Sequence, residues 1–289
     1  MTNEEIEVVE AKHMHIAEDN NSIDIQIKTA HAFPRSIKTF KDMAMTMATA
    51  DAETAESCFY VLPRGGKSIE GPSVRLAEIV GSAWGNVRYG ARIIREDDKF
   101  IYAEGMAFDL ERNVAMTIEV RRRITNKYGK KYPDDMIGTT ANAACSIALR
   151  NAIFKVIPKA FVDPIYKAAK QAAIGDIQTL ETRRSKMIDH FGKMGVDPSR
   201  IYWAMGIVGI EDVDLLKLEQ LMGMATAIKD GDMHIDEAFP PVPKDGEPDK
   251  NESKPKSLTE KIKKKNEMNK KAEHKATESL HQREPGEEG

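Results

Sequence analysis

The chain has 289 residues, a formal net charge of −3 and a hydrophobic fraction of 41%, which is enough for a packed core. That length suits one sizeable domain with an appendage, or two small domains. No apolar run approaches the roughly 18 residues of a membrane-spanning helix. The acidic start is unlike a signal peptide, and two cysteines make neither a disulfide framework nor a zinc site. We therefore expect a cytoplasmic protein with no membrane segment.

Charge is distributed unevenly along the chain. Residues 1–30 contain seven acidic residues against two lysines, whereas residues 31–175 contain 22 Lys and Arg against 16 Asp and Glu. A basic middle behind an acidic leader is typical of a core that binds a polyanion. A chance asymmetry in an ordinary enzyme is the alternative.

The first sixty residues give few strong patterns. Residues 1–30 lack a sustained period, and we expect a mobile leader with one short strand at 23–27. A methionine-rich helix is predicted over 36–50, and a strand over 58–62. The methionines are expected to fill the core rather than to bind a ligand.

The turn after that strand carries a partial nucleotide-binding motif. Gly66-Lys67-Ser68 matches the end of a phosphate-binding loop, but Val61 stands where the motif needs its first glycine. We therefore reject nucleotide binding here and predict no cofactor. Arg64 and Lys67 become candidates for contact with a nucleic-acid backbone, the alternative being a solvated hairpin tip.

The middle of the chain predicts the core of the fold. A buried helix is expected to begin at Gly71-Pro72 and to end at Gly81. Three strands with short turns and then a long alanine-rich helix follow, over 87–94, 100–110, 114–125 and 140–157. This order predicts an α+β fold, an antiparallel β-meander packed by a long helix (β-β-β-α), with one sheet face covered and one free.

The remainder is predicted to be helical and then disordered. Helix signals near Ile177, at Asp197-Pro198-Ser199 and at Asp212 or Asp214 indicate a small C-terminal bundle. After Pro240 the sequence is charged and poorly apolar, as disordered tails are. The predicted domains are a mobile leader (1–30), an α+β core (31–175), a helical module (176–239) and a disordered charged tail (240–289).

Motifs for catalysis are absent from the sequence. The histidines are scattered without His-Glu-x-x-His spacing, and no Gly-x-Ser-x-Gly occurs. We predict a protein that is not an enzyme and holds no metal. The enzyme alternative is a metal-dependent nuclease or transferase that uses Glu104, Asp109 and Asp134.

Basic and aromatic residues concentrate between the third strand and the long helix. Arginine binds phosphate bidentately, and aromatic rings stack on bases. Arg121 and Arg123 face one side of a strand and Arg122 the other, so the three cannot all serve one groove. The alternative is an outer strand paired to Glu119. The candidate DNA-binding residues here are Arg121, Arg122, Arg123, Lys127, Lys130, Lys131, Arg150, Lys155 and Lys159, with Tyr128 and Tyr132 as candidates for base stacking.

Residues 55–170 resemble a known family in the order and spacing of their elements. The stretches that carry the resemblance are Ser68-Ile69-Glu70-Gly71, Val74, Leu76-Ala77, Gly81, Trp84, Lys99-Phe100-Ile101, Ala107-Phe108-Asp109-Leu110-Glu111 and Ala148-Leu149-Arg150-Asn151-Ala152-Ile153. They resemble the annealing core of single-strand DNA annealing proteins. These are the phage RecT, Redβ and Erf groups and the eukaryotic Rad-type annealing protein that shares their fold.

The resemblance implies a homo-oligomer, a ring or filament, that binds single-stranded DNA and anneals complementary strands without ATP in phage homologous recombination. It implies Arg150 and Lys155 as groove cations, with Lys159 as an extension and Arg75 as a looser match. The basic turn 126–132 departs from the family pattern. The resemblance also implies that the helical module contacts a phage exonuclease or the host single-strand-binding protein. A structural oligomer whose basic turn makes subunit contacts is a further alternative.

Overall fold

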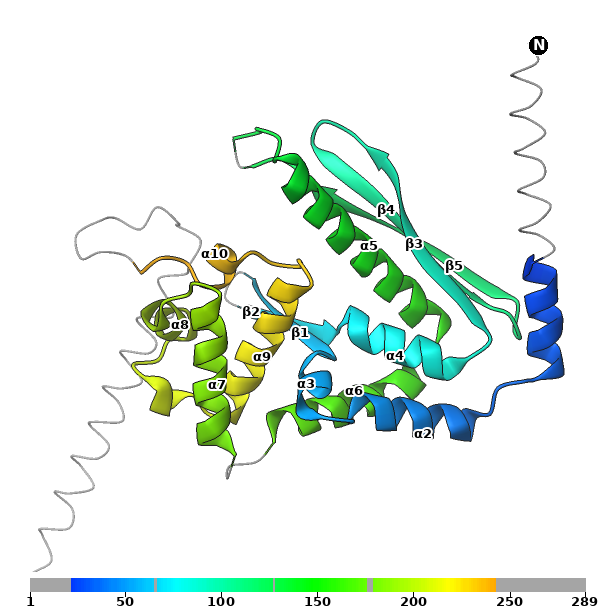
Figure 1. Cartoon of the computed structure of the whole chain (residues 1–289), viewed down its shortest axis with the longest axis horizontal. Coiled ribbons are helices and arrows are strands. Elements are labelled where there is room, and N and C mark those ends of the chain that lie inside the picture. Colours follow the sequence, from blue (N-terminus) through cyan, green and yellow to red (C-terminus); the bar gives the residue numbers. More distant parts are fainter. Residues whose placement is uncertain (1–21, 65–66, 127, 176–178, 243–289) are drawn as a thin grey trace, which may run out of the picture. The chain divides into compact units, whose positions relative to one another are not determined.

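The computed structural model describes residues 22–64, 67–126, 128–175 and 179–242, which form an α+β fold (Figure 1). Most of the predicted acidic leader and all but the first residues of the predicted tail lie outside these ranges. The elements are α2 (Ile37–Ala48), α3 (Ala52–Glu56), β1 (Phe59–Arg64), β2 (Lys67–Pro72), α4 (Val74–Trp84), β3 (Val87–Glu96), β4 (Phe100–Asp109), β5 (Val114–Arg123), α5 (Asp134–Val156), α6 (Lys159–Ile174), α7 (Leu180–Lys193), α8 (Pro198–Met205), η1 (Ile210–Asp212), α9 (Leu215–Lys229) and α10 (Ile235–Ala238).

The predicted meander is confirmed. Strands β3, β4 and β5 form an antiparallel sheet in that order, and β1 and β2 form a separate two-stranded sheet. The turn from β4 to β5 places Asn113 at φ 54°, a left-handed conformation that asparagine tolerates better than most residues. A register shift between Ile93 and Arg95 is a β-bulge near the end of β3.

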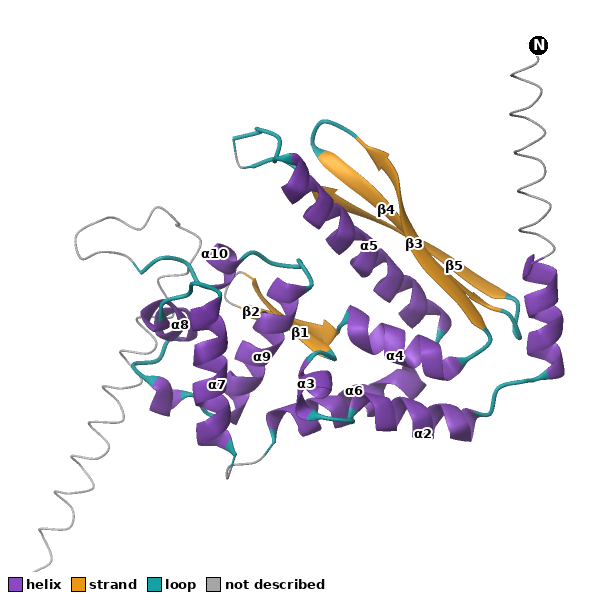
Figure 2. Ribbon diagram, in the orientation of Figure 1, coloured by secondary structure: helices purple, strands orange, loops and turns teal. Residues whose placement is uncertain are grey.

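Helix α5 covers one face of the meander, and small residues allow it to come close (Figure 2). A Cβ atom added to Gly105 of β4 would lie 2.2 Å from the backbone C and O of Ala148 in α5. Ala144 and Ala148 of the helix are fully buried beside Ala103 of the same strand. Alanine and glycine on both surfaces therefore set the distance between helix and sheet.

Helix α5 begins at Asp134, six residues before the predicted start. Pro133 precedes it in an extended conformation, and Asp134 and Asp135 occupy the first turn. Carboxylates there are stabilised by the partial positive charge of the helix N-terminus, so the acidic residues lengthen the helix. Its predicted end before Pro158 is confirmed.

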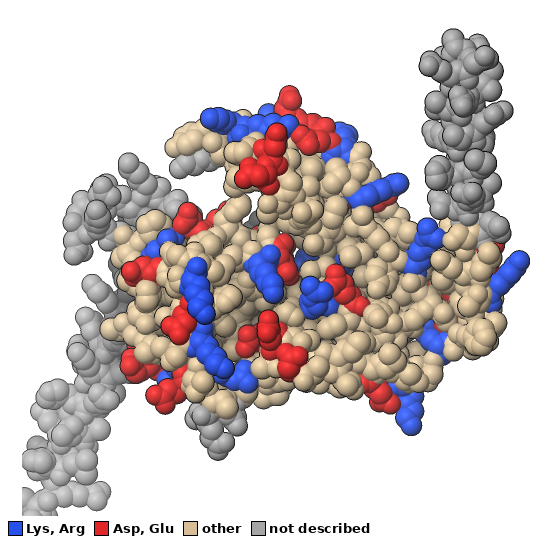
Figure 3. All heavy atoms as spheres, viewed as in Figure 1, with Lys and Arg blue, Asp and Glu red and all other residues tan. Residues whose placement is uncertain are grey.

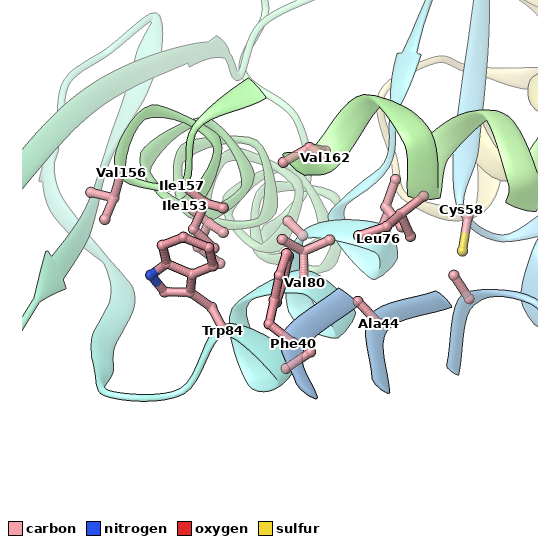
Figure 4. Close-up of a cluster of buried hydrophobic side chains, with 14 of the residues drawn as sticks. Phe40, Ala44, Cys58, Leu76, Val80, Trp84, Ile153, Val156, Ile157 and Val162 are labelled. Atoms are coloured by element: carbon pink, nitrogen blue, oxygen red, sulfur yellow. The ribbon is translucent and has the colours of Figure 1, made fainter. Parts of the chain in front are cut away.

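A second layer of packing joins α5 to α2, α4 and α6. Phe40 and Trp84 meet edge to face with ring centroids 4.9 Å apart, and Ile153 and Val162 lie in the same buried cluster (Figure 4). The cluster combines residues that precede the meander in the sequence with residues that follow it. Burial of these side chains is what fixes α4 and α6 beside α5.

Two predicted helix boundaries are wrong. Gly71 and Pro72 end β2, and α4 begins at Val74 behind Ser73, whose hydroxyl accepts the Leu76 N–H at 3.3 Å. Gly81 lies inside α4 rather than at its end. A glycine fits there because the ring of Tyr89 packs where a side chain would be. Serine is a strong N-cap, and it sets the start of this helix.

The predicted strand at 23–27 is also wrong, because residues 22–32 are helical. Ile23, Ile27 and Ala30 recur at helical spacing and are the inward-facing positions, with Ala30 only 1% exposed. Ile25, which lies between these positions, is exposed.

The predicted helices after residue 179 are present. Asp197 caps α8 and Asp214 caps α9, as the sequence indicates. The core of these helices includes Phe59 and Val61 of β1, and a Cβ added to Gly223 of α9 would meet Val61 at 2.4 Å. The helices and β1 therefore share one core. None of the described helices combines the length and apolar character that crossing a membrane requires.

Candidate nucleic-acid interface

The three consecutive arginines of β5 divide between the two faces of the sheet, as the sequence predicts. Arg121 and Arg123 are exposed on the face opposite α5. Arg122 is half-buried on the α5 side, where its Nη2 donates to the carbonyl oxygen of Gly231 at 2.8 Å. The three arginines therefore lie at two separate surfaces of the sheet.

The open face carries an ordered set of arginines and rings, which we call the arginine–aromatic face. Its members come from all three strands and are Arg92, Arg95, Phe100, Tyr102, Arg121 and Arg123. The register of the sheet sets Phe100 beside Arg123, and Tyr102 between Arg95 and Arg121. Figure 2 shows α5 on one face of this sheet and no helix against the middle of the other.

The aromatic rings hold the guanidinium groups in place. Arg95 lies 3.8 Å from the ring centroid of Tyr102, and Arg121 and Arg123 lie 5.3 and 5.4 Å from that of Phe100. Such cation–π contacts orient arginine without neutralising it. Tyr102 is only 9% exposed beneath Arg95, so the face presents guanidinium groups rather than bare rings.

Three of these arginines, Arg95, Arg121 and Arg123, form no ion pair in the described part of the chain, so the expected alternative of a pairing with Glu119 is not seen. Arg95 does interact with Asp97, whose pKa is lowered by hydrogen bonds from the Lys99 and Phe100 N–H groups and, to a smaller extent, by the charge of Arg95. Arg92 bonds Glu104 at 3.0 Å, and Glu119 lies directly opposite Glu104 in the register. Figure 3 shows basic and acidic side chains interspersed over the face it views. Because Glu104 and Glu119 lie on the same face of the sheet as the arginines, the placement of individual arginines, rather than a uniform positive charge, distinguishes this surface.

The basic turn 126–132 is tied to the end of β3. The Asn126 carboxamide oxygen accepts the N–H groups of Tyr128 and Lys130, and Gly129 adopts φ 83°. Lys131 bonds Glu96 at 2.6 Å, and this hydrogen bond raises the pKa of the lysine. Tyr128 and Lys130 are exposed and follow Arg123 of the arginine–aromatic face by only a few residues in the sequence. Lys127 lies outside the described residues.

Tyr132 does not fit its predicted stacking role. It is half-buried and packs with Ile101, Ile124 and Ala144 between the sheet and α5. Its backbone N–H donates to the carbonyl oxygen of Ile124 at 2.9 Å, which brings the end of the turn back to the sheet. A tyrosine in this position packs against the core cluster beside α5 and keeps only part of its ring exposed.

Arg150 is not a free groove cation in this structure. Its Nη1 donates to Asp232 Oδ2 at 3.2 Å, and the two side chains are only 11% and 5% exposed. The guanidinium also lies 4.7 Å from the ring centroid of Tyr60. Arg75, the looser match, pairs with Glu78 on its own helix and is otherwise exposed.

The other predicted contacts lie elsewhere. Lys155 is exposed near the end of α5, and Lys159, which is 85% exposed, begins α6. Helix α5 is 23 residues long, so about 34 Å separates its ends, and the basic turn precedes its start. Lys155 and Lys159 are therefore remote from the turn. Arg64 and Lys67 end β1 and begin β2, and their side chains fall outside what the structure describes.

The residues of the enzyme alternative do not converge. Arg35 binds both carboxylate oxygens of Asp109, at 2.6 and 2.5 Å, and Glu104 pairs with Arg92. Asp134 begins α5. Among the described residues, no three His, Cys, Asp or Glu side chains are grouped as metal ligands. Val61, which broke the phosphate-loop motif, lies within β1.

Comparison with protein-family models, with curated proteins and with solved structures gives no match. The interpretation of the site therefore depends on its geometry. The sequence prediction missed Arg92, Arg95, Phe100 and Tyr102 as members of the site. Period-two alternation in the strands assigns Arg92 to a free face, but the cross-strand neighbours depend on the register and on the bulge near Arg95.

Proposed function

We propose that this protein binds single-stranded DNA along the arginine–aromatic face and anneals complementary strands without ATP. The observation that carries the proposal is the set of three arginines, Arg95, Arg121 and Arg123, which aromatic rings orient and which form no ion pair with the described residues. Because the rings restrict these side chains before binding, less conformational entropy is lost when a phosphate is bound. A guanidinium also matches two phosphate oxygens at once.

The covered rings favour contact with the backbone rather than with bases. Arg95 lies over Tyr102, so a base has no direct access to that ring. Arg121 and Arg123 are two residues apart on one strand, about 7 Å along it, a spacing that an extended sugar–phosphate chain can follow. A strand held by its phosphates keeps its bases turned outward, and outward bases are available to a complementary strand.

The resemblance described above supports the same function, and we propose that the annealing serves phage homologous recombination. It also suggests a homo-oligomer. Within the described chain, β3 and β5 each pair with β4 alone, so both edges of the meander are open. Open edges can add a strand from a second copy, and repetition would extend the arginine–aromatic face around a ring or along a filament. Mass measurements with and without oligo(dT) test this, and a monomer under both conditions would contradict it.

The direct test compares two double variants of equal charge. Arg121→Gln/Arg123→Gln removes two cations from the face, whereas Lys38→Gln/Lys193→Gln removes two exposed cations elsewhere. We expect the first to weaken oligo(dT) binding about tenfold and to slow annealing of fluorescent complementary oligonucleotides, and the second to change little. Equal losses in both variants would show that only net charge matters, and unchanged binding in the first would reject the site.

A further inference from the structure

A second group of cations converges on the loop that follows α9, residues 230–233, which we call the acidic loop. Arg150 bonds Asp232 through its side chain, and Arg122 donates to the backbone oxygen atoms of Gly231 and Asp232 at 2.8 and 3.5 Å. Burial, followed by the charge of Asp232, raises the pKa of Asp230 to about 6, while Arg150, Arg75 and Lys229 act in the opposite direction. Two of the arginines predicted to contact DNA, Arg122 and Arg150, therefore bind this loop, and a third, Arg75, lines the same cleft as Asp230.

The acidic loop is held against α5 at short range. Gly231 has φ 74°, and a Cβ added to it would lie 2.9 Å from the Cβ of Ala143. Ala143 and Arg150 are seven residues apart, so they lie on the same side of α5. The loop thus covers the helix surface on which Arg150 stands.

A carboxylate and a phosphate can each accept two parallel hydrogen bonds from a guanidinium group, so one can replace the other as its partner. We propose that Arg122 and Arg150 form a phosphate-binding site that the acidic loop occupies through Asp232, and that a single strand displaces the loop. The inference rests on the proposed function and concerns its regulation. Unlike the arginine–aromatic face, this site lies on the α5 side of the sheet, so the two can be tested separately.

Exchange of the loop for a phosphate is physically reasonable. The desolvation penalty of a buried ion pair offsets much of its attraction, so replacing one anion by another need not be strongly unfavourable. Arg75, Lys229 and Asp230 line a cleft between α3, α4, α7 and α9. This cleft also contains Arg183 and Lys186, together with Glu53 and Glu56, and Arg183 pairs with Glu56. The cleft gives a polyanion a route to the loop from solvent, past four Lys and Arg side chains and three carboxylates.

The test is the affinity of purified full-length protein for fluorescent oligo(dT) across a salt series. Asp232→Asn keeps the size of the side chain and removes its charge, and we expect binding about fivefold tighter. The slope of log affinity against log salt should become steeper by about 0.7 for each phosphate gained. Asp236→Asn, which removes an 80% exposed carboxylate from the same part of the chain, is the matched control and should bind as wild type. Adding Arg150→Gln to Asp232→Asn should abolish the gain.

A loop that only fastens the helices to α5 gives a different result. Asp232→Asn would then bind like wild type or more weakly, and that result, with wild type binding, overturns the inference while the proposed function stands. If neither protein binds oligo(dT) in dilute salt, both are overturned. Equal gains in Asp232→Asn and Asp236→Asn also overturn it, because net charge then explains the effect.

A second measurement, on the wild-type protein, keeps the test decisive if Asp232→Asn unfolds, which circular dichroism would reveal. The N–H groups of Gly231 and Asp232 donate to the carbonyl oxygens of Ile228 and Ala227, so hydrogen exchange reports whether the loop stays in place. We expect these two amides to exchange faster when oligo(dT) is bound. Unchanged exchange with oligo(dT) bound overturns the inference.

Discussion

Replacing Gly105 by alanine tests the contact that fixes α5 on the meander. The new methyl group would lie 2.2 Å from the backbone C and O of Ala148 and 2.6 Å from the Leu149 nitrogen. Carbon atoms in contact prefer about 3.5 to 4.0 Å, so helix and strand must separate by more than 1 Å. Because the obstructing atoms are backbone, side-chain rotation cannot relieve the overlap. We expect a loss of about 3 kcal/mol in the free energy of unfolding.

Urea denaturation followed by circular dichroism measures this loss, which corresponds to a Tm lower by about 6 to 12 °C. Two alanine substitutions serve as controls, because a Cβ added at Gly90 in β3 or at Gly138 in α5 meets nothing within 4 Å. Gly90→Ala should be neutral or slightly stabilising, and Gly138→Ala should gain up to about 1 kcal/mol through helix propensity. A loss below about 1 kcal/mol for Gly105→Ala would refute the packing described here.

Three further predictions concern charged groups. Arg35→Ala should lower the free energy of unfolding by about 3 to 5 kcal/mol in urea denaturation. Arg35 is 6% exposed, and its loss leaves the 2% exposed carboxylate of Asp109 without its cation. Arg92→Ala is the control, because Arg92 is 75% exposed, and an equal loss in both variants would contradict the prediction. Burial pulls the pKa of Glu111 upward, but hydrogen bonds from Asn86 and Arg35 outweigh it and leave the pKa below its ordinary 4.5. A lowered folded pKa means that Glu111 stabilises the protein above pH 4.5 and ceases to do so as pH falls through the folded value, so Glu111→Gln should destabilise at pH 7 and converge with wild type in acid. The pKa of Asp230 shifts in the opposite direction, from 3.8 to about 6, so the ionised carboxylate destabilises the folded state above pH 6. Asp230→Asn should therefore raise the free energy of unfolding by about 1 to 2 kcal/mol at pH 7.5, after allowance for solvent screening. Below pH 4 the substitution should have no such effect. Destabilisation by Asp230→Asn at pH 7.5 would contradict this.

The architecture of the meander could be read from the sequence because its determinants are local. Strand alternation and short turns predict β3 to β5, and Asp197 and Asp214 mark helix starts through capping chemistry. Some errors were local, since the prediction overlooked the Ser73 cap that starts α4, and others arose where a nonlocal contact decides the outcome. Gly81 looks like a helix end, yet it is retained inside α4 because Tyr89 needs the space.

The candidate site was only partly predictable for the same reason. The division of Arg121 and Arg123 from Arg122 follows from the two-residue period of a strand and is confirmed. The partners of these residues follow from cross-strand register and tertiary packing. No pattern near Arg150 indicates Asp232, which is 82 residues away in the chain. When a loop from a distant part of the sequence packs against a site, the residues near the site carry no pattern that predicts the contact.

The salt dependence of single-strand binding tests the central claim most directly. Each phosphate neutralised on a single strand contributes about 0.7 to the slope of log affinity against log salt concentration. Replacing Arg95, Arg121 and Arg123 together by glutamine should therefore reduce the magnitude of that slope by about 2 relative to wild type. A variant that binds more weakly with an unchanged slope, or one that binds as wild type does, would show that these arginines do not hold the DNA backbone.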